Sequence, residues 1–494
     1  MSVRRQAADA RSDARCRVVL GLLLALAAVL RLCASFTLGA RTELHGDEWQ
    51  YVRAAYAILC GGGYPGTLRP PVFPALLAFG FAAGGDTLFA AQLVQMLVGV
   101  GTVALTYALA RPRFGCRAAL VSAAFVALDP TLVNYTHYLW SETLCAFLLA
   151  ALVLALDRFD LTRRERWLVV AGVALGAGAL TREVLLYVLP VIVLWLLGTR
   201  ADLRTRCRQL ALLLAPVVLI VGSWTARNVF TQGHFVLVST ARWAPIAEGL
   251  LLEQQPGRLV SKATSDFRAQ LAQRHDDVER ETYARGVALE AMRRIPPERV
   301  MSRLWAGPRA LFSIDNQTIR FLRQRWFPAA YAGAARVVAR IEVVYYVVAM
   351  LLAVLGLWLV PGGRTKTLIV GILLTFVVIH TIAVSTNRYR VPLLPLLTLY
   401  VGPLLGGAGR RQRGARWRPL GAALTMAVFL TIVVQTYQLA EVGRTLFVSM
   451  RAEAASSPRQ VRRALRVARR ASLRQELGCA AQRRRVAPPE RTRD

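Results

Sequence analysis

VVLGLLLALAAVLRLCASFTLGARTELHGDEWQY, residues 18–51 of this chain, is an apolar segment with a single arginine, Arg31, followed closely by two adjacent carboxylates, Asp47 and Glu48. Residues 18–39 are long enough to cross a bilayer, which takes roughly 20 predominantly apolar residues in a helix. The two acids therefore fall where a membrane-spanning helix meets water. They are either solvated loop residues or the charged centre of a site, and the rest of the sequence has to distinguish these two interpretations.

The composition is that of a multi-pass membrane protein. Of the 494 residues, 55% are hydrophobic, and they are grouped in blocks of membrane-spanning length. We predict an all-α integral membrane protein, a polytopic bundle of about eleven transmembrane helices. An uncleaved first helix is favoured over a cleaved signal peptide because so many spans follow. The predicted spans cover residues 18–39, 88–110, 118–134, 143–156, 167–180, 184–197, 210–226, 341–360, 368–384, 391–405 and 420–439.

The net charge of +33 follows the predicted topology and does not indicate a nucleic-acid partner. Arginine-rich strings alternate with less basic connections, and the positive-inside rule places these strings in the cytoplasm together with the leader, residues 1–17. The strings are residues 111–117, 157–166, 200–208, 362–367 and 410–418. The connections assigned to the outer face are residues 41–86, 135–142, 181–182, 227–340 and 385–390.

This topology divides the chain into five parts. The predicted parts are a basic leader (1–17), an N-terminal transmembrane module (18–226) whose first outer loop is residues 40–86, an outer segment (227–340), C-terminal transmembrane helices (341–440) and a basic tail (441–494). In the first outer loop, EWQYVRAAYAIL and RPPVFPALLAFGF predict helices that lie along the membrane interface. The segment 227–340 predicts a small extracytoplasmic cap. The tail either lies on anionic lipid as a basic amphipathic helix or indicates one miscounted span.

Polar residues gather at the outward ends of the predicted spans. Arginine binds phosphate oxygens through a planar fork, and a carboxylate can take the proton of an attacking hydroxyl. A pocket with both groups suits a reaction in which an anionic phosphate leaves and a hydroxyl attacks. The residues concerned are Asp47, Glu48, Arg69, His137, Glu142, Arg182, Glu183, Arg227, Asn228, Arg388, Tyr389 and Arg390.

The order of several motifs resembles the GT-C class of membrane glycosyltransferases. The resemblance is to the branch that includes protein O-mannosyltransferases and lipid A aminoarabinose transferases, and it covers roughly residues 18–405. In chain order it rests on Arg31 late in the first span, GDEWQY, RPPVFP, WSET, LTRE, WTARN and NRYRVPLLP. Each motif is degenerate alone, and the resemblance lies in their order and topological placement.

The resemblance implies transfer of a monosaccharide from a polyprenyl-phosphate donor, with inversion, to a glycan, lipid or protein acceptor on the extracytoplasmic face. It implies a plasma-membrane protein of bacteria that contacts membrane lipids and needs no cofactor. Asp47 matches the catalytic base and Glu48 its acidic neighbour, while Arg69 stands where the lipid phosphate is held. Matches to residues lining the donor site are Glu142, Arg182, Arg388 and Tyr389.

No metal site is predicted. Leu68 stands where the aminoarabinose transferases have a glutamate, and the chain has no acidic motif with DxD-like spacing, so the resemblance implies a metal-independent enzyme. The seven cysteines are scattered without a CxxC pair, so neither a disulfide framework nor a zinc site is expected.

Simpler interpretations accompany these residues. Asp47 and Glu48 can be a solvated acidic turn, Arg69 can reach toward lipid headgroups, and Glu142 can cap a helix. Arg388 and Arg390 can anchor a helix end, and the partner of Arg31 is either Asp47 or a backbone carbonyl. At the level of function, the alternatives are a transporter or flippase for an amphiphilic anion and an inactive scaffold. A transporter predicts internal repeats and helices broken at mid-membrane, and the sequence shows neither sign.

Overall fold

The computed structural model describes residues 2–39, 44–61, 63–85, 87–251, 262–274, 276–324, 326–327, 329–406 and 417–439. Within these ranges the regular secondary structure is helical throughout, as predicted. The predicted basic tail, residues 441–494, lies outside the described residues.

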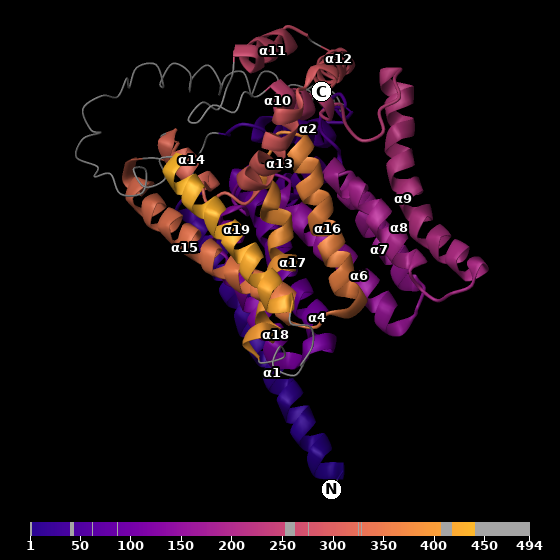
Figure 1. Cartoon of the computed structure of the whole chain (residues 1–494), viewed down its shortest axis with the longest axis vertical. Helices are drawn as coiled ribbons and strands as arrows, with labels where there is room; N and C mark the ends of the chain where they lie inside the picture. Colours follow the sequence, from indigo (N-terminus) through magenta and orange to yellow (C-terminus); the bar gives the residue numbers. More distant parts are fainter. Residues whose placement is uncertain are drawn as a thin grey trace, which may run out of the picture.

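The elements follow the chain in this order (Figure 1): α1 (Ser2–Phe36), α2 (Glu48–Leu59), α3 (Val72–Gly84), α4 (Leu88–Leu128), α5 (Pro130–Asn134), α6 (Glu142–Thr162), α7 (Arg166–Ala179), η1 (Glu183–Val188), α8 (Leu189–Leu197), α9 (Leu203–Gln232), α10 (Trp243–Leu251), α11 (Lys262–Ala272), α12 (Asp277–Arg294), α13 (Pro297–Leu311), α14 (Gln317–Arg323), α15 (Ala329–Leu359), α16 (Gly363–Ile382), η2 (Asn387–Leu393), α17 (Leu394–Thr398), α18 (Val401–Leu405) and α19 (Trp417–Leu439).

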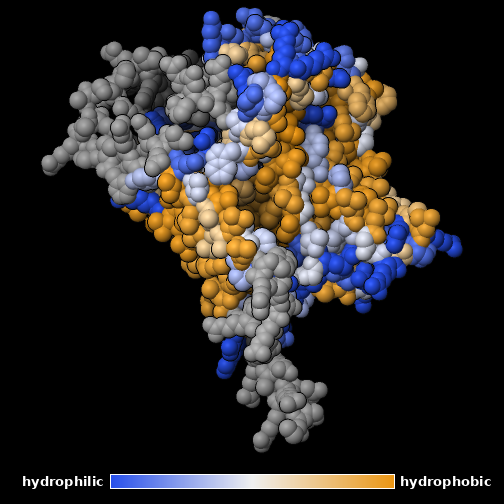
Figure 2. All heavy atoms as spheres, viewed as in Figure 1, coloured by the Kyte–Doolittle hydropathy of each residue, from blue (hydrophilic) through white to orange (hydrophobic). Residues whose placement is uncertain are grey.

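Six helices of the described chain are long and apolar enough to cross a membrane: α1, α4, α9, α15, α16 and α19. By length and composition they mark the chain as a multi-pass membrane protein. Figure 2 shows hydrophobic side chains covering the middle of the molecule, with hydrophilic ones concentrated toward its two ends. The total of eleven spans stays a prediction.

Glycine and proline lie where several predicted spans begin or end. Residues 88–110 and 118–134 were expected as two spans, and α4 covers most of both but departs from helical geometry at Gly115, whose φ is 79°. Glycine adopts a positive φ at little steric cost, so this position marks a turn between two helical halves. The predicted spans 184–197 and 391–405 begin within the 3₁₀ turns η1 and η2. Pro392 lies inside η2, and Pro190 lies in the first turn of α8, directly after η1.

The predicted cytoplasmic strings contact one another at one end of the molecule. Arg113 forms ion pairs with Asp157 and Asp160 and donates to the Thr365 hydroxyl at 2.7 Å. Arg364 donates to the Gly198 carbonyl at 2.9 Å. Four connections that are far apart in sequence are thereby joined, as expected if they share one side of the membrane.

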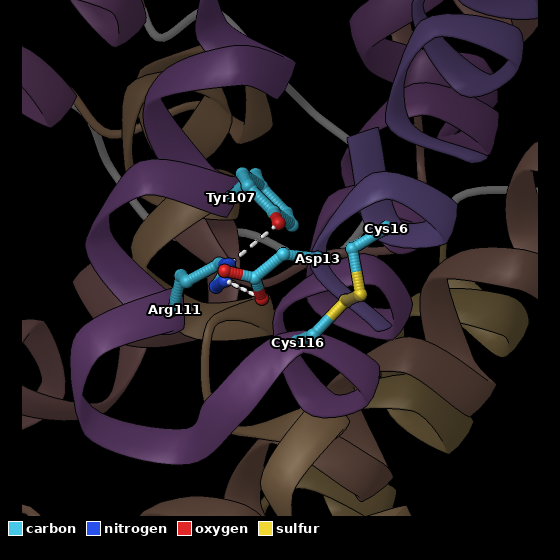
Figure 3. Close-up of a disulfide and its surroundings, with 5 residues drawn as sticks. All are labelled: Asp13, Cys16, Tyr107, Arg111 and Cys116. Carbon is cyan, nitrogen blue, oxygen red and sulfur yellow. Dashed lines mark hydrogen bonds and ion pairs between the residues drawn. A yellow bond between two sulfur atoms is a disulfide. The ribbon is translucent and has the colours of Figure 1, made fainter. Parts of the chain in front are cut away.

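The leader is attached to the same end by a disulfide (Figure 3). Cys16 is bonded to Cys116, next to the Asp13–Arg111 ion pair of 2.6 Å. The expectation that no disulfide is present was therefore wrong. The two cysteines are 100 positions apart in the sequence, so no local pattern predicts the pairing, and the packing of α1 against α4 brings them together.

The outer segments gather at the opposite end (Figure 1), where α2, α10, α11 and α12 lie away from the N-terminus. Helices α10, α11 and α12 enclose a small hydrophobic core of their own, made of Ala247, Leu250, Phe267, Ala284 and Ala288. We call these three helices the cap.

Arg31 is buried inside the bundle and is held by backbone carbonyls. One of its terminal nitrogens donates to the Ala27 carbonyl at 3.0 Å and lies 3.4 Å from the Ala127 carbonyl. This contact resolves the two alternatives for Arg31 in favour of a structural partner.

The packing of α18 on α4 predicts a stability effect at Gly402. A Cβ at this position would collide with the Ala118 carbonyl and the Ser122 hydroxyl. We expect Gly402→Ala to destabilise the protein by about 1–3 kcal/mol because the backbone of α18 must move away from α4. The matched control is Gly222→Ala in α9, where a Cβ meets nothing within 4 Å. Thermal unfolding in detergent measures both variants, and equal loss in the two would contradict this account of the interface.

Candidate active site

Asp47 lies at the N-terminus of α2 and is the point where distant parts of the chain meet. Its side chain forms no capping hydrogen bond with the helix. Its two oxygens instead pair with arginines, Oδ1 with Arg69 at 2.8 Å and Oδ2 with Arg388 at 2.9 Å. The interpretation of Asp47 as a solvated turn does not fit this geometry, because its carboxylate is engaged on both oxygens and only 34% exposed.

Glu142 is the second acidic centre and is fully buried at the first turn of α6. Its Oε1 accepts hydrogen bonds from Arg182 and Arg388, and its Oε2 lies 3.3 Å from Nη2 of Arg388. Arg388 therefore bridges the two acids, Asp47 and Glu142. We call these five residues, Asp47, Arg69, Glu142, Arg182 and Arg388, the charged cluster.

Aromatic rings support each arginine of the cluster. The guanidinium carbon of Arg69 lies 5.1 Å from the centroid of the Tyr51 ring. The corresponding distances are 5.1 Å from Arg182 to Tyr389 and 4.1 Å from Arg388 to Trp140. A cation over a ring face is attracted by the quadrupole of the ring, so these contacts orient the guanidiniums as well as stabilising them.

The cluster carries more positive than negative charge. It contains three guanidiniums and two carboxylates, so one positive charge is left over in a partly dehydrated place. Burial acts to raise the pKa of Asp47, but Arg69 and Arg388 outweigh burial and hold that pKa below its ordinary value. Asp47 is therefore ionised at neutral pH, and the surplus positive charge is available to an anion.

Glu48 has different contacts from its neighbour. It is fully buried, its Oε1 accepts the backbone N–H of Leu139 at 2.8 Å, and its Oε2 accepts the N–H of His45 at 2.7 Å. The His45 ring stacks on Trp326 at a centroid distance of 4.3 Å. Glu48 thus fastens the Asp47 loop to the loop before α6, and its oxygens are used by the backbone.

Four residues that were not predicted from the sequence complete the cluster. Gln50 accepts from Nε of Arg69 at 2.6 Å. The Tyr51 hydroxyl lies 3.3 Å from the Ser141 hydroxyl, which is 3.4 Å from Arg182. Trp140 supports Arg388. All four lie inside the motifs GDEWQY and WSET, so adjacency to the acids was the signal that could have found them.

Other residues of the predicted constellation are structural. Arg390 is buried, stacks on Tyr346 at 3.8 Å and donates to the carbonyls of Leu311 and Ser313. Asn228 donates to the Val236 carbonyl at 2.9 Å. Among the described residues, no group of three or more His, Cys, Asp or Glu side chains is arranged to hold a metal ion.

Comparison with known proteins bears on this geometry. Residues 68–224 match the family model described as dolichyl-phosphate-mannose-protein mannosyltransferase. The predicted resemblance is confirmed over this segment. The matched range includes Arg69, Glu142 and Arg182, and it ends before Arg388.

A curated relative is the putative mannosyltransferase YkcB of Bacillus subtilis (strain 168), which is 27% identical over 171 residues. That alignment covers 34% of this chain and 24% of YkcB, so the chain matches only about a quarter of that protein's length.

Solved structures with a similar arrangement include ArnT from Cupriavidus metallidurans in the apo state, 18% identical, with 78% of each chain covered and a TM-score of 0.39. Another is the Archaeoglobus fulgidus oligosaccharyltransferase tethered to an acceptor peptide, 14% identical, with 87% of this chain and 55% of that chain covered and a TM-score of 0.47.

The contacts of Glu48 predict a loss of stability on substitution. Glu48→Ala removes the acceptor of two buried N–H groups, so we expect a destabilisation of about 1–3 kcal/mol. Glu48→Gln keeps one carbonyl oxygen and should lose less. Heat-induced unfolding in detergent tests this order, and a Glu48→Ala protein as stable as the parent would show that these hydrogen bonds do not hold the loop.

Proposed function

We propose that the chain is a membrane glycosyltransferase that moves a monosaccharide from a polyprenyl-phosphate donor to an acceptor hydroxyl on the extracytoplasmic face of a bacterial plasma membrane. The observation that carries the proposal is the bridging of Asp47 by Arg69 and Arg388. A base and two anion-binding groups occupy one place there, which is what a phosphate leaving group and a hydroxyl nucleophile require. The family match over residues 68–224 supports the same reaction class.

The roles follow from the contacts of the charged cluster. Arg69 and Arg388 bind the donor phosphate and release Asp47 as they do so. Asp47 then accepts the proton of the acceptor hydroxyl, whose oxygen bonds to the anomeric carbon while the carbon–phosphate oxygen bond breaks and its electron pair leaves with the phosphate. The incoming and leaving oxygens lie on opposite faces of the sugar, so the configuration inverts.

The remaining residues hold the arginines. Glu142 pairs with Arg182 and Arg388, and its negative charge offsets the repulsion between these two guanidiniums. The Tyr389 ring supports the Arg182 guanidinium, whose central carbon lies 5.1 Å from the ring centroid. Glu48 positions the loop that carries Asp47 and takes no proton itself. We also propose that transfer needs no metal ion and that residues 227–340 recognise the acceptor. The division of the chain into the five predicted parts is proposed with them.

The test uses the purified full-length protein with radiolabelled polyprenyl-phosphate sugars and membrane fractions, with and without EDTA. Release of polyprenyl phosphate with label moving to an acceptor supports the proposal. Label that crosses a liposome bilayer unchanged supports a transporter instead. Loss of transfer in EDTA would overturn metal independence alone.

Asp47→Asn should lower transfer at least about a hundredfold, because an amide cannot accept the proton of the acceptor. Folding should persist, since Arg388 keeps Glu142 and Arg69 keeps Gln50 as partners. Initial rates and size-exclusion profiles of the two proteins measure both effects. Near-normal turnover would remove Asp47 from the mechanism.

The pH dependence follows from the depressed pKa of Asp47. Because that pKa lies below the ordinary value of 3.8, Asp47 stays ionised from about pH 8 down to about pH 5, and its protonation should reduce transfer only below that range. A pH profile of kcat/KM checks this. An acid limb near neutral pH that Asp47→Asn abolishes in the residual activity would contradict it.

A further inference from the structure

The segment that presents Arg69 is a loop, residues 64–71, rather than a helix. Arg69 can bind a phosphate in one place only if the backbone of this loop is fixed. Within this segment the Tyr64 hydroxyl donates to the carbonyls of Arg69 at 2.9 Å and Pro70 at 3.1 Å, which ties the start of the loop to its end. We call residues 64–71 the arginine loop.

The N-terminal part of the arginine loop is held both by Arg227 of α9, which donates to the carbonyls of Tyr64 and Gly66, and by the cap. Oδ2 of Asp277, the first residue of α12, accepts the N–H of Thr67 at 3.0 Å and the N–H of Leu68 at 3.2 Å. The Thr67 carbonyl accepts the N–H of Thr240 at 3.0 Å. One carboxylate of the cap therefore fixes the backbone N–H groups of the two residues that precede Arg69.

Gly66 shows how closely the cap approaches. Its φ is +64°, a conformation that favours glycine, and a Cβ at this position would collide with the Asp277 carboxylate. Glycine is required here both by the turn and by the approach of Asp277.

The same face of α12 reaches the second arginine-bearing turn. Glu281, one helical turn after Asp277, accepts the N–H of Trp243 at 3.3 Å. The adjacent Arg242 pairs with Glu183, which also accepts the Ser239 hydroxyl at 3.1 Å. Glu183 directly follows Arg182 of the charged cluster, so α12 is connected to the arginine loop and to the turn that carries Arg182.

From these contacts we propose that Asp277 is a positioning residue that ties the cap to the arginine loop, so that donor binding by Arg69 depends on where the cap lies. This inference rests on the proposed function, because it takes Arg69 as the group that binds the donor phosphate. It gives the outer segment a role in the donor site in addition to acceptor recognition. A cap shifted by a bound acceptor then changes the affinity for the donor.

The experiment compares the donor dependence of transfer in the full-length protein and three single variants. Asp277→Ala removes both hydrogen bonds and should raise the KM for the polyprenyl-phosphate sugar about tenfold, with kcat changed by less than about twofold. Asp277→Asn keeps an oxygen that accepts both N–H groups and should stay near the parent values. The control is Asp276→Ala, which removes the N-cap of α12 but leaves Asp277 in place.

A double variant separates positioning from general damage. If Asp277 acts through Arg69, adding Asp277→Ala to Arg69→Ala should not raise the donor KM further. An additive effect, an unchanged KM in Asp277→Ala, or the same rise in Asp276→Ala would overturn the inference.

A binding experiment distinguishes this inference from the proposed function. Native mass spectrometry measures how much polyprenyl phosphate, without any sugar, binds to the parent and to the same variants. Weaker binding in Asp277→Ala than in Asp277→Asn supports the positioning role even if the parent transfers no sugar. Equal binding across all variants would refute it while leaving a measured transferase activity intact. A parent that neither binds polyprenyl phosphate nor transfers sugar would overturn both.

Discussion

The pairing of the buried Glu142 carboxylate with Arg182 and Arg388 is the interaction on which the site depends. Removing charges from water costs several kcal/mol per ion, and the attraction between partners offsets that cost only when the geometry is good. Here one carboxylate, that of Glu142, pairs with two guanidiniums that come from opposite halves of the chain. Without Glu142, Arg182 would lose its carboxylate partner and Arg388 would keep Asp47 alone, so the packing of α6 against η2 also fixes where these arginines lie.

The features that depend only on neighbouring residues in the chain could be predicted from the sequence. Hydropathy predicts helices of membrane-spanning length, and six of the described helices have that length and composition. Breaks at glycine follow from backbone chemistry, and α4 departs from helical geometry at Gly115. The motifs containing Asp47, Arg69 and Glu142 could be placed on one face by topology alone. The contact between the cluster residues could not be predicted, because Asp47 and Arg388 are separated by 341 positions in the sequence. No periodicity encodes such a contact.

The failures of prediction have physical reasons too. Glu48 and Asp47 are chemically alike in the sequence, yet one faces backbone donors and the other faces guanidiniums, and only the packing of the loop against Leu139 separates them. Arg390 follows Arg388 by two residues in a 3₁₀ turn, and the turn sends them to different partners. The Cys16–Cys116 bond depends on two helices meeting. Each of these features is decided by tertiary contacts, so residue type alone could not have assigned it.

The double engagement of Asp47 bears on how a catalytic cycle would end. A site lined only by arginines would hold a polyprenyl phosphate tightly once the sugar has gone, and turnover would slow. Asp47 competes for Arg69 and Arg388 as soon as it has returned its proton to water, and its low pKa favours that return. On the proposed mechanism, the ion pairs of Asp47 with Arg69 and Arg388 re-form after transfer and thereby promote release of the polyprenyl phosphate. Asp47 thus acts both as the base and as the group that displaces the product.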